Sequence, residues 1–263
     1  MSTRLYIAFF VAIFSALSPI SSKNIKFEGY KVRRLVIDAG HGGRDTGCRG
    51  KKLFEKEITL PLALAVEKLI AEKYPDVQIF QSRADDTFMR PGARADFANC
   101  QKADLLISIH CNSLPRYPDV HGTETYVMRH ERNRLDVDVP DNDDMELHSS
   151  ITTGGADAIV SSNSVIAALH KNPNLYQSVK LANFVEKRLS EFTPLESRGV
   201  RQENLSVLRD TYMPAILIEI GYLSNVNEEN YIISPEGKTN IAQSIASAFG
   251  DYKESIENTK LFK

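Results

Sequence analysis

One almost unbroken apolar segment constrains the fold of this 263-residue chain more than any other feature. Residues Asp104–Ser113 read DLLISIHCNS, a pattern typical of a strand buried on both faces of a parallel sheet. Further strands are predicted at 33–40, 76–83, 121–128 and 214–225, and helical spacing at 57–74, 91–101, 175–192 and 235–257. This alternation predicts an α/β fold: a single domain with a mostly parallel twisted sheet of about six strands and helices on both faces.

The first residues are typical of an export signal. Arg4 supplies the positive charge, and the apolar run Leu5–Leu17 is shorter than the roughly 20 residues that span a bilayer. We therefore predict a signal peptide at 1–22, a folded domain at 33–256, and an exported protein, periplasmic or extracellular. The alternative is a retained membrane anchor; after cleavage of the signal, no stable membrane span is expected.

Charge and cysteine content exclude two classes of protein. The net charge is −2 and no long basic run appears, so nothing favours a nucleic-acid partner. The three cysteines, Cys48, Cys100 and Cys111, form no C-x-x-C motif, and an odd number cannot pair completely within the chain. The chain is therefore not a disulfide scaffold.

Three ionisable residues interrupt or follow the apolar strands. His41 follows VIDAG, His110 ends LLISIH, and Glu219 lies inside AILIEIG. Ligands of open α/β sheets bind beyond the carboxyl ends of strands, and a buried carboxylate needs a partner or a cation. These residues therefore indicate a metal site at one edge of the sheet.

The spacing leaves open which carboxylate completes this site. A catalytic zinc typically takes three protein ligands and leaves the fourth position to water. His41, His110 and either Glu219 or Glu55, which lies close to the glycine-rich loop in FEKEITL, supply three. The remaining carboxylate is then free to deprotonate the water.

Each of these residues also has a plainer interpretation. A histidine at a strand end is often a satisfied core residue. Glu55 alone fits a first-turn helix carboxylate, which the helix dipole favours. Glu219 alone fits an ion pair with Arg83 or Arg209. Only the combination of the residues on one sheet favours the metal site.

Five blocks in order resemble the zinc-dependent N-acetylmuramoyl-L-alanine amidases of the amidase type 3 family. They are VIDAGHGGRDTG, FEKEITL, SIHCNS, GTETY and RGVRQENLSVLRDTYMPAILIEIGYLSN. The segment SRADDTFMRPGARADFAN is also similar to that family, with Arg83, Asp86, Arg94 and Asn99 at matching places. The resemblance extends from about Arg34 to Tyr252, apart from one irregular insert.

The resemblance assigns roles that spacing left open. It implies that Zn²⁺ is bound by His41, Glu55 and His110, and that Glu219 is the catalytic glutamate. It also implies cleavage of the amide between N-acetylmuramic acid and L-alanine in peptidoglycan, for cell wall remodelling or daughter-cell separation.

Three further residues are weaker candidates. Glu124 in GTETY is expected either to orient a metal ligand or to form a cross-strand charge pair. Arg209 is a candidate for substrate contact. Cys111 should point to the face of the sheet opposite His110, which favours a core thiol over a fourth ligand.

Residues 129–174 lack the periodicity of the rest and form an irregular, acidic insert. Cell-division members of the resembled family carry at this place a helix that covers the zinc until an activator protein displaces it. By this resemblance the insert is a candidate regulatory lid, with Glu146 as the first candidate to occupy the open zinc position. The alternative is a mobile acidic loop.

Two other functions compete with the amidase. A zinc peptidase that cuts within the stem peptide would use the same chemistry. An inactive relative that only binds peptidoglycan would be expected to lack a ligand or Glu219, and this chain has all four residues.

Overall fold

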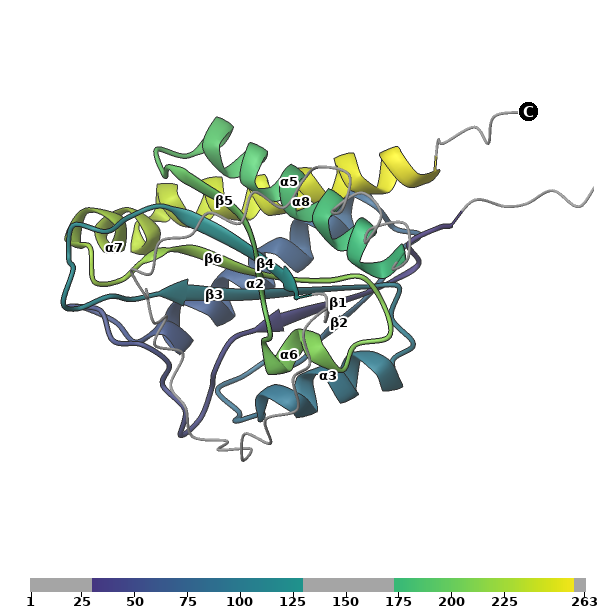
Figure 1. Cartoon of the computed structure of the whole chain (residues 1–263), viewed down its shortest axis with the longest axis horizontal. Helices are drawn as coiled ribbons and strands as arrows, with labels where there is room; N and C mark the ends of the chain where they lie inside the picture. Colours follow the sequence, from purple (N-terminus) through teal and green to yellow (C-terminus); the bar gives the residue numbers. More distant parts are fainter. Residues whose placement is uncertain (1–29, 130–172, 258–263) are drawn as a thin grey trace, which may run out of the picture.

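Six strands form one sheet in the order β2-β1-β3-β6-β4-β5 (Figure 1). The computed structural model describes residues 30–129 and 173–257. Strands β2, β1, β3 and β6 are parallel, β4 runs antiparallel to β6, and β5 runs parallel to β4. The bounds are β1 Arg34–Ala39, β2 Gln78–Gln81, β3 Leu105–Asn112, β4 Thr123–Met128, β5 Ser197–Glu203 and β6 Ala215–Tyr222. The predicted mostly parallel sheet of six strands is confirmed.

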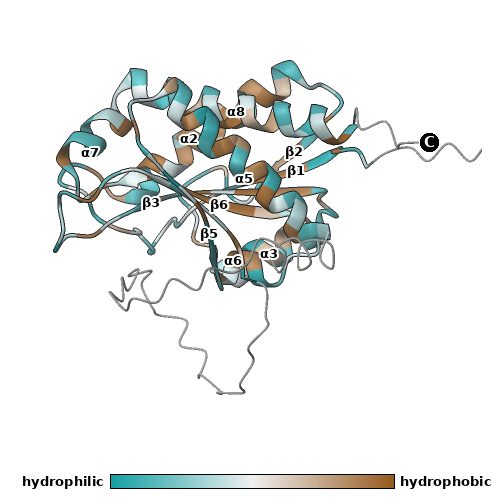
Figure 2. Ribbon diagram, turned by 45° about the horizontal axis from the view of Figure 1, so that its top comes forward, coloured by the Kyte–Doolittle hydropathy of each residue, from teal (hydrophilic) through white to brown (hydrophobic). Residues whose placement is uncertain are grey.

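Helices pack on both faces of the sheet, as predicted (Figure 1). One face carries α2 (Glu55–Lys73), α5 (Pro173–Phe192), α7 (Val226–Ile233) and α8 (Pro235–Glu257). The other carries the shorter α3 (Pro91–Cys100) and α6 (Ser206–Arg209). Figure 2 shows the apolar residues along the central strands, between these two layers.

Strand β6 shows how the two faces are built. Its residues Ile216, Ile218 and Ile220 belong to the large apolar cluster beneath α2, α5 and α8. Ala215 and Leu217 belong to the smaller cluster beneath α3 and α6. Because alternate side chains point to opposite faces, every second position of β6 shares the face of α3 and α6.

Three elements differ from the sequence prediction. Residues 193–210 are predicted as a loop but contain β5 and α6, and α7 was not predicted. Strand β5 has the sequence SRGVRQE and no buried residue; backbone pairing with β4 holds it, which hydrophobic periodicity cannot reveal. Helix α7 has only eight residues and is capped by Asn225, the residue before it, whose side chain accepts hydrogen bonds from the amides of Asn227 and Glu228.

The three cysteines are free thiols, and Cys111 is buried in the large apolar cluster, as expected for a core residue. In the described ranges, the helices are too short or too polar to cross a bilayer. The predicted signal peptide and nearly all of the insert, including Glu146, lie outside the described residues.

Candidate metal centre and active site

A row of ionisable residues crosses three adjacent strands. The register pairs His110 of β3 with Glu219 of β6, and Glu219 with Glu124 of β4. Glu219 lies two residues beyond Leu217 and therefore shares the face of α3 and α6. Helices α3 and α6 cover the amino-terminal halves of β3 and β6 (Figure 1). The row lies nearer the carboxyl ends of these two strands.

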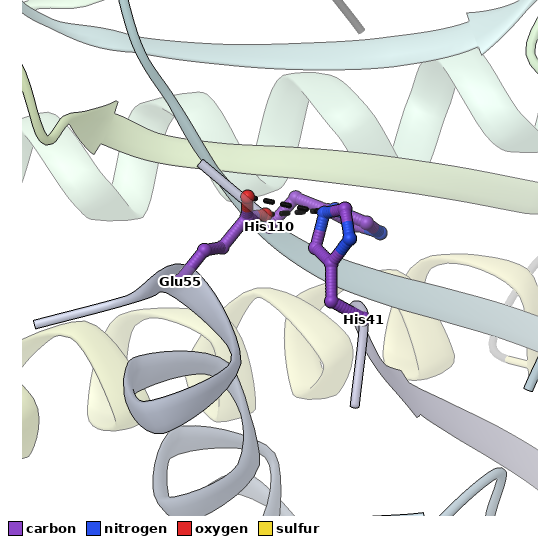
Figure 3. A group of neighbouring side chains, drawn as sticks. All are labelled: His41, Glu55 and His110. Atoms are coloured by element: carbon purple, nitrogen blue, oxygen red, sulfur yellow. Dashed lines mark hydrogen bonds and ion pairs between the residues drawn. The ribbon is translucent and has the colours of Figure 1, made fainter. Parts of the chain in front are cut away.

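His41, Glu55 and His110 converge at this end of the sheet (Figure 3). One nitrogen or oxygen atom from each lies within 4.8 Å of the others. The Glu55 carboxylate lies between the two rings, 3.1 Å from Nε2 of His41 and 2.9 Å from Nδ1 of His110. The two ring centroids are 5.0 Å apart. The structure therefore brings together the three residues that the resemblance named as metal ligands.

Glycines make this convergence possible. A Cβ atom on Gly40 would lie 2.5 Å from the ring of His110. At Gly47, it would lie 2.5 Å from both the His41 ring and the Glu55 carboxylate. His41 itself has a φ of 58°, a left-handed conformation that costs energy in a residue other than glycine and is concentrated at functional sites. The loop after β1 thus holds His41 in a strained conformation beside two positions that only glycine fits.

Hydrogen bonds orient the first histidine. The Asp45 carboxylate lies 2.8 Å from Nδ1 of His41, so Nε2 faces Glu55. Metal-binding histidines characteristically use their second ring nitrogen in this way. Burial would lower the pKa of His41, but the bonds to Asp45 and Glu55 raise it to about 10. Asp45 was not among the predicted site residues. The one feature of the sequence that could have indicated its role is its position four residues after His41.

The Glu55 carboxylate is held equally firmly. It accepts hydrogen bonds from the backbone amides of Cys48 (3.0 Å) and Cys111 (2.9 Å). Burial would raise its pKa, but His110 and His41 lower it below the ordinary value. An ionised carboxylate between two imidazoles favours a positive charge at the centre of the three side chains. Two imidazoles and a carboxylate are also a typical donor set for catalytic zinc.

Glu219 is buried beside this cluster without a partner. Its exposed fraction is 1%, and within residues 30–129 and 173–257 neither carboxylate oxygen has a hydrogen-bond partner. Burial, and then the negative charge of Glu55, raise its pKa above the ordinary value. The ion pair with Arg83 or Arg209, considered from the sequence, is therefore not formed. A buried carboxylate with both oxygens free fits a group that acts on a bound ligand.

Two buried arginines hold the strand end that presents His41. Arg83 donates to the carbonyl oxygens of Ala39 (3.0 Å) and Gly40 (2.8 Å). Arg94 donates to those of Ala39 (2.7 Å) and His41 (2.8 Å). The sequence resemblance marked both arginines, but their contacts with the backbone of the ligand loop could not be read from spacing.

Asp38 anchors Arg94 inside the protein. Its carboxylate is fully buried, lies 2.6 Å from Nη1 of Arg94, and accepts hydrogen bonds from Ser108 (2.6 Å) and Ser82 (2.5 Å). Burial would raise the pKa of Asp38, but Arg94, the field of His110 and the two hydroxyls lower it. A lowered carboxyl pKa contributes stability that is present above the unfolded pKa and lost as the pH falls through the folded pKa.

We expect Asp38→Asn to lower the free energy of unfolding by about 3 kcal/mol at pH 7, because it leaves a buried arginine without its counter-charge. Urea unfolding monitored by circular dichroism measures this. The difference from the wild type should shrink below about pH 4, where the unfolded wild-type carboxyl is protonated. A difference that stays constant down to pH 3 would show that the charge of Asp38 is not the stabilising feature.

A second anchor holds the loop that leads into Glu55. Glu229 of α7 is fully buried and accepts hydrogen bonds from three consecutive amides, those of Lys51 (3.1 Å), Lys52 (2.7 Å) and Leu53 (3.3 Å). A Cβ atom on Gly50 would lie 2.2 Å from the Glu229 carboxylate. The loop at Lys51–Leu53 leads directly into α2, which begins at Glu55. The position of this loop therefore depends on a helix about 175 residues further along the chain.

We expect Glu229→Gln to lower the free energy of unfolding by about 1–3 kcal/mol, because the new amide group faces a backbone donor instead of accepting from it. Hydrogen exchange at the amides of Lys51–Leu53 should become faster. Glu236→Gln, at an exposed glutamate of α8, is the matched control and should leave exchange unchanged. Unaltered protection in Glu229→Gln would mean that the loop holds itself.

The structure also shows where Glu124 and Arg209 lie. Glu124 lies in the cross-strand charge pair that was one of its two expected roles: Nε of Arg198 lies 2.7 Å away and Nε of Arg201 lies 3.0 Å away. It accepts hydrogen bonds from Arg198 and from the Tyr126 hydroxyl rather than from a candidate ligand. Arg209 ends α6, before the amino end of β6, and so lies at the edge of the sheet opposite the cluster.

Known proteins with similar sequences include several cell wall amidases. The sequence pattern described as N-acetylmuramoyl-L-alanine amidase matches residues 35–250. The chain is 28% identical to an uncharacterized cell wall amidase of Bacillus anthracis, over 84% of this chain and 36% of the relative. It is also 28% identical to the probable N-acetylmuramoyl-L-alanine amidase AmiB of Haemophilus influenzae, over 86% of this chain and 53% of the relative. The chain thus spans about a third to a half of these relatives.

A solved structure extends the similarity to three dimensions. It is the catalytic domain of CwlV, an N-acetylmuramoyl-L-alanine amidase from Bacillus (Paenibacillus) polymyxa var. colistinus. The TM-score is 0.63 with 32% identity, covering 84% of this chain and 97% of that domain. With the family pattern over most of its length and the His-Glu-His cluster in place, this chain belongs to the amidase type 3 family of N-acetylmuramoyl-L-alanine amidases.

Proposed function

We propose that this protein is a zinc-dependent amidase that hydrolyses the bond between the lactyl group of N-acetylmuramic acid and L-alanine in peptidoglycan. The observation that carries the proposal is the convergence of His41, Glu55 and His110 beside the buried, unpartnered Glu219 in a chain of this family. The predicted export signal agrees with a substrate in the cell envelope.

His41, Glu55 and His110 would hold the zinc. When bound, zinc polarises a scissile carbonyl and lowers the pKa of a water molecule. Asp45 and the amides of Cys48 and Cys111 keep the ligands in place before substrate arrives, so little reorganisation is needed.

Glu219 carries the proton transfers in this proposal. Its carboxylate takes a proton from the attacking water as the new C–O bond forms, and returns it to the nitrogen of L-alanine as the C–N bond breaks. The products are a free lactyl carboxylate and a stem peptide with a free amino terminus. Both oxygens of Glu219 are available because no described residue donates to them.

Digestion of purified peptidoglycan, with zinc or with a chelator, tests the proposal. Mass spectrometry should identify intact stem peptides that begin with a free L-alanine, released only with zinc. Fragments cut between stem residues would identify a zinc peptidase instead. Absence of products from zinc-loaded protein would favour a relative that binds peptidoglycan without cutting it.

A further inference from the structure

Two arginines of β5 share one buried carboxylate next to the candidate active site. Arg198 and Arg201 both direct Nε at the same oxygen of Glu124, at 2.7 Å and 3.0 Å. The other oxygen of Glu124 accepts a hydrogen bond from the Tyr126 hydroxyl at 2.6 Å. Glu124 thus fixes both guanidinium groups on the face of the sheet that carries Glu219.

The arginine pair carries more positive charge than its partner neutralises. Glu124 balances one of the two guanidinium charges. Arg198 also donates to the carbonyl of His121 at 3.3 Å. The Arg201 side chain is 45% exposed, and in the described part of the chain its ion pair is with Glu124, through Nε. The outer nitrogens of Arg201 are therefore available for a second acceptor.

The placement of Arg201 suits a group on the same substrate. Strand β5 is two strands from β6, with β4 between them, and neighbouring strands are about 4.8 Å apart. The Arg201 side chain leans back over β4 to reach Glu124, which is paired in register with Glu219. Its guanidinium therefore lies roughly one to two strand spacings, about 5–10 Å, from the strand of Glu219.

We propose that Arg201, held by Glu124 beside Arg198, binds the free α-carboxylate of the second residue of the stem peptide. This inference rests on the proposed amidase function. An extended peptide advances about 3.3–3.6 Å per residue, so this carboxylate lies roughly 7 Å beyond the scissile amide, which is comparable with the separation of about 5–10 Å between the Arg201 guanidinium and the strand of Glu219. A guanidinium that is anchored through Nε can still donate short, charge-assisted hydrogen bonds to a second carboxylate from its other nitrogens.

Paired substrates test the subsite. They are uncrosslinked glycan chains whose stem peptides carry D-glutamate joined through its γ-carboxyl, with the α-carboxyl either free or amidated. We expect the wild type to have a kcat/KM on the order of 10-fold higher for the acid than for the amide. Arg201→Gln should remove this preference by lowering kcat/KM for the acid alone, and Arg201→Lys should restore part of it. Arg33→Gln, an exposed arginine paired with Asp76 at the start of β1, should keep the full preference.

The possible outcomes distinguish failure of the proposed carboxylate subsite from failure of the proposed amidase activity. Equal rates on the acid and the amide by active wild-type enzyme would overturn the subsite and leave the amidase intact. So would an equal loss on both substrates in Arg201→Gln, because that would show a structural role. Failure of the wild type to cleave either substrate would overturn the proposed function itself.

Discussion

Glu219→Gln is expected to lower kcat on peptidoglycan by about 10²–10⁴-fold while zinc remains bound, because general acid–base catalysis contributes factors of this size. The substitution preserves shape and removes only the ability to take up and return a proton. No described residue donates a hydrogen bond to the carboxylate, so the glutamine should not destabilise the metal-free protein. Turnover, zinc content and thermal unfolding measured on one preparation check all three statements.

Glu254→Gln, at an exposed glutamate of α8, is the control for a change of charge alone and should behave as the wild type. Near wild-type turnover by Glu219→Gln with zinc bound would remove Glu219 from the mechanism. Loss of both turnover and zinc would make it a ligand, the alternative that residue spacing left open.

Glu55→Gln should reduce zinc affinity by far more than the roughly 10- to 100-fold typical of residues that only support a ligand. The variant removes the negative charge that lies between the His41 and His110 rings. Activity on peptidoglycan should fall with zinc content. Competition with a chromophoric chelator measures the affinity, and circular dichroism confirms that the variant is folded.

Glu57→Gln is the matched control for this variant. Glu57 is exposed in the same first turn of α2 and accepts a hydrogen bond from the amide of Phe54. Its replacement should leave zinc affinity unchanged. If Glu55→Gln bound zinc as tightly as Glu57→Gln, the metal would have to be held by other residues.

Much of this site could be predicted because ionisable residues are easily recognised within the apolar runs of buried strands. His110 and Glu219 stand out since each interrupts a run of buried apolar residues, and His41 stands out among glycines. Periodicity places such residues at one edge of a sheet, but it cannot order them around a metal. The choice of Glu55 over Glu219 came from the family resemblance, and the structure places Glu55 between the two rings.

The contacts of the supporting residues could not be predicted because their partners are backbone groups far away in sequence. Glu229 binds three amides about 175 residues earlier in the chain, and Arg94 binds carbonyls more than 50 residues earlier. Such contacts leave no periodic trace. Strand β5 was missed for a related reason: it is held by pairing with β4 and not by burial, so Arg201 was predicted to lie in a loop.

The most direct test of the central claim is a diffraction measurement across the zinc absorption edge on crystals of the active, zinc-loaded protein. We predict one anomalous peak at bonding distance, roughly 2.0–2.2 Å, from His41, Glu55 and His110. Glu219 should lie beside the peak without bonding to it. A peak on other residues, or no peak in crystals of active enzyme, would contradict the account.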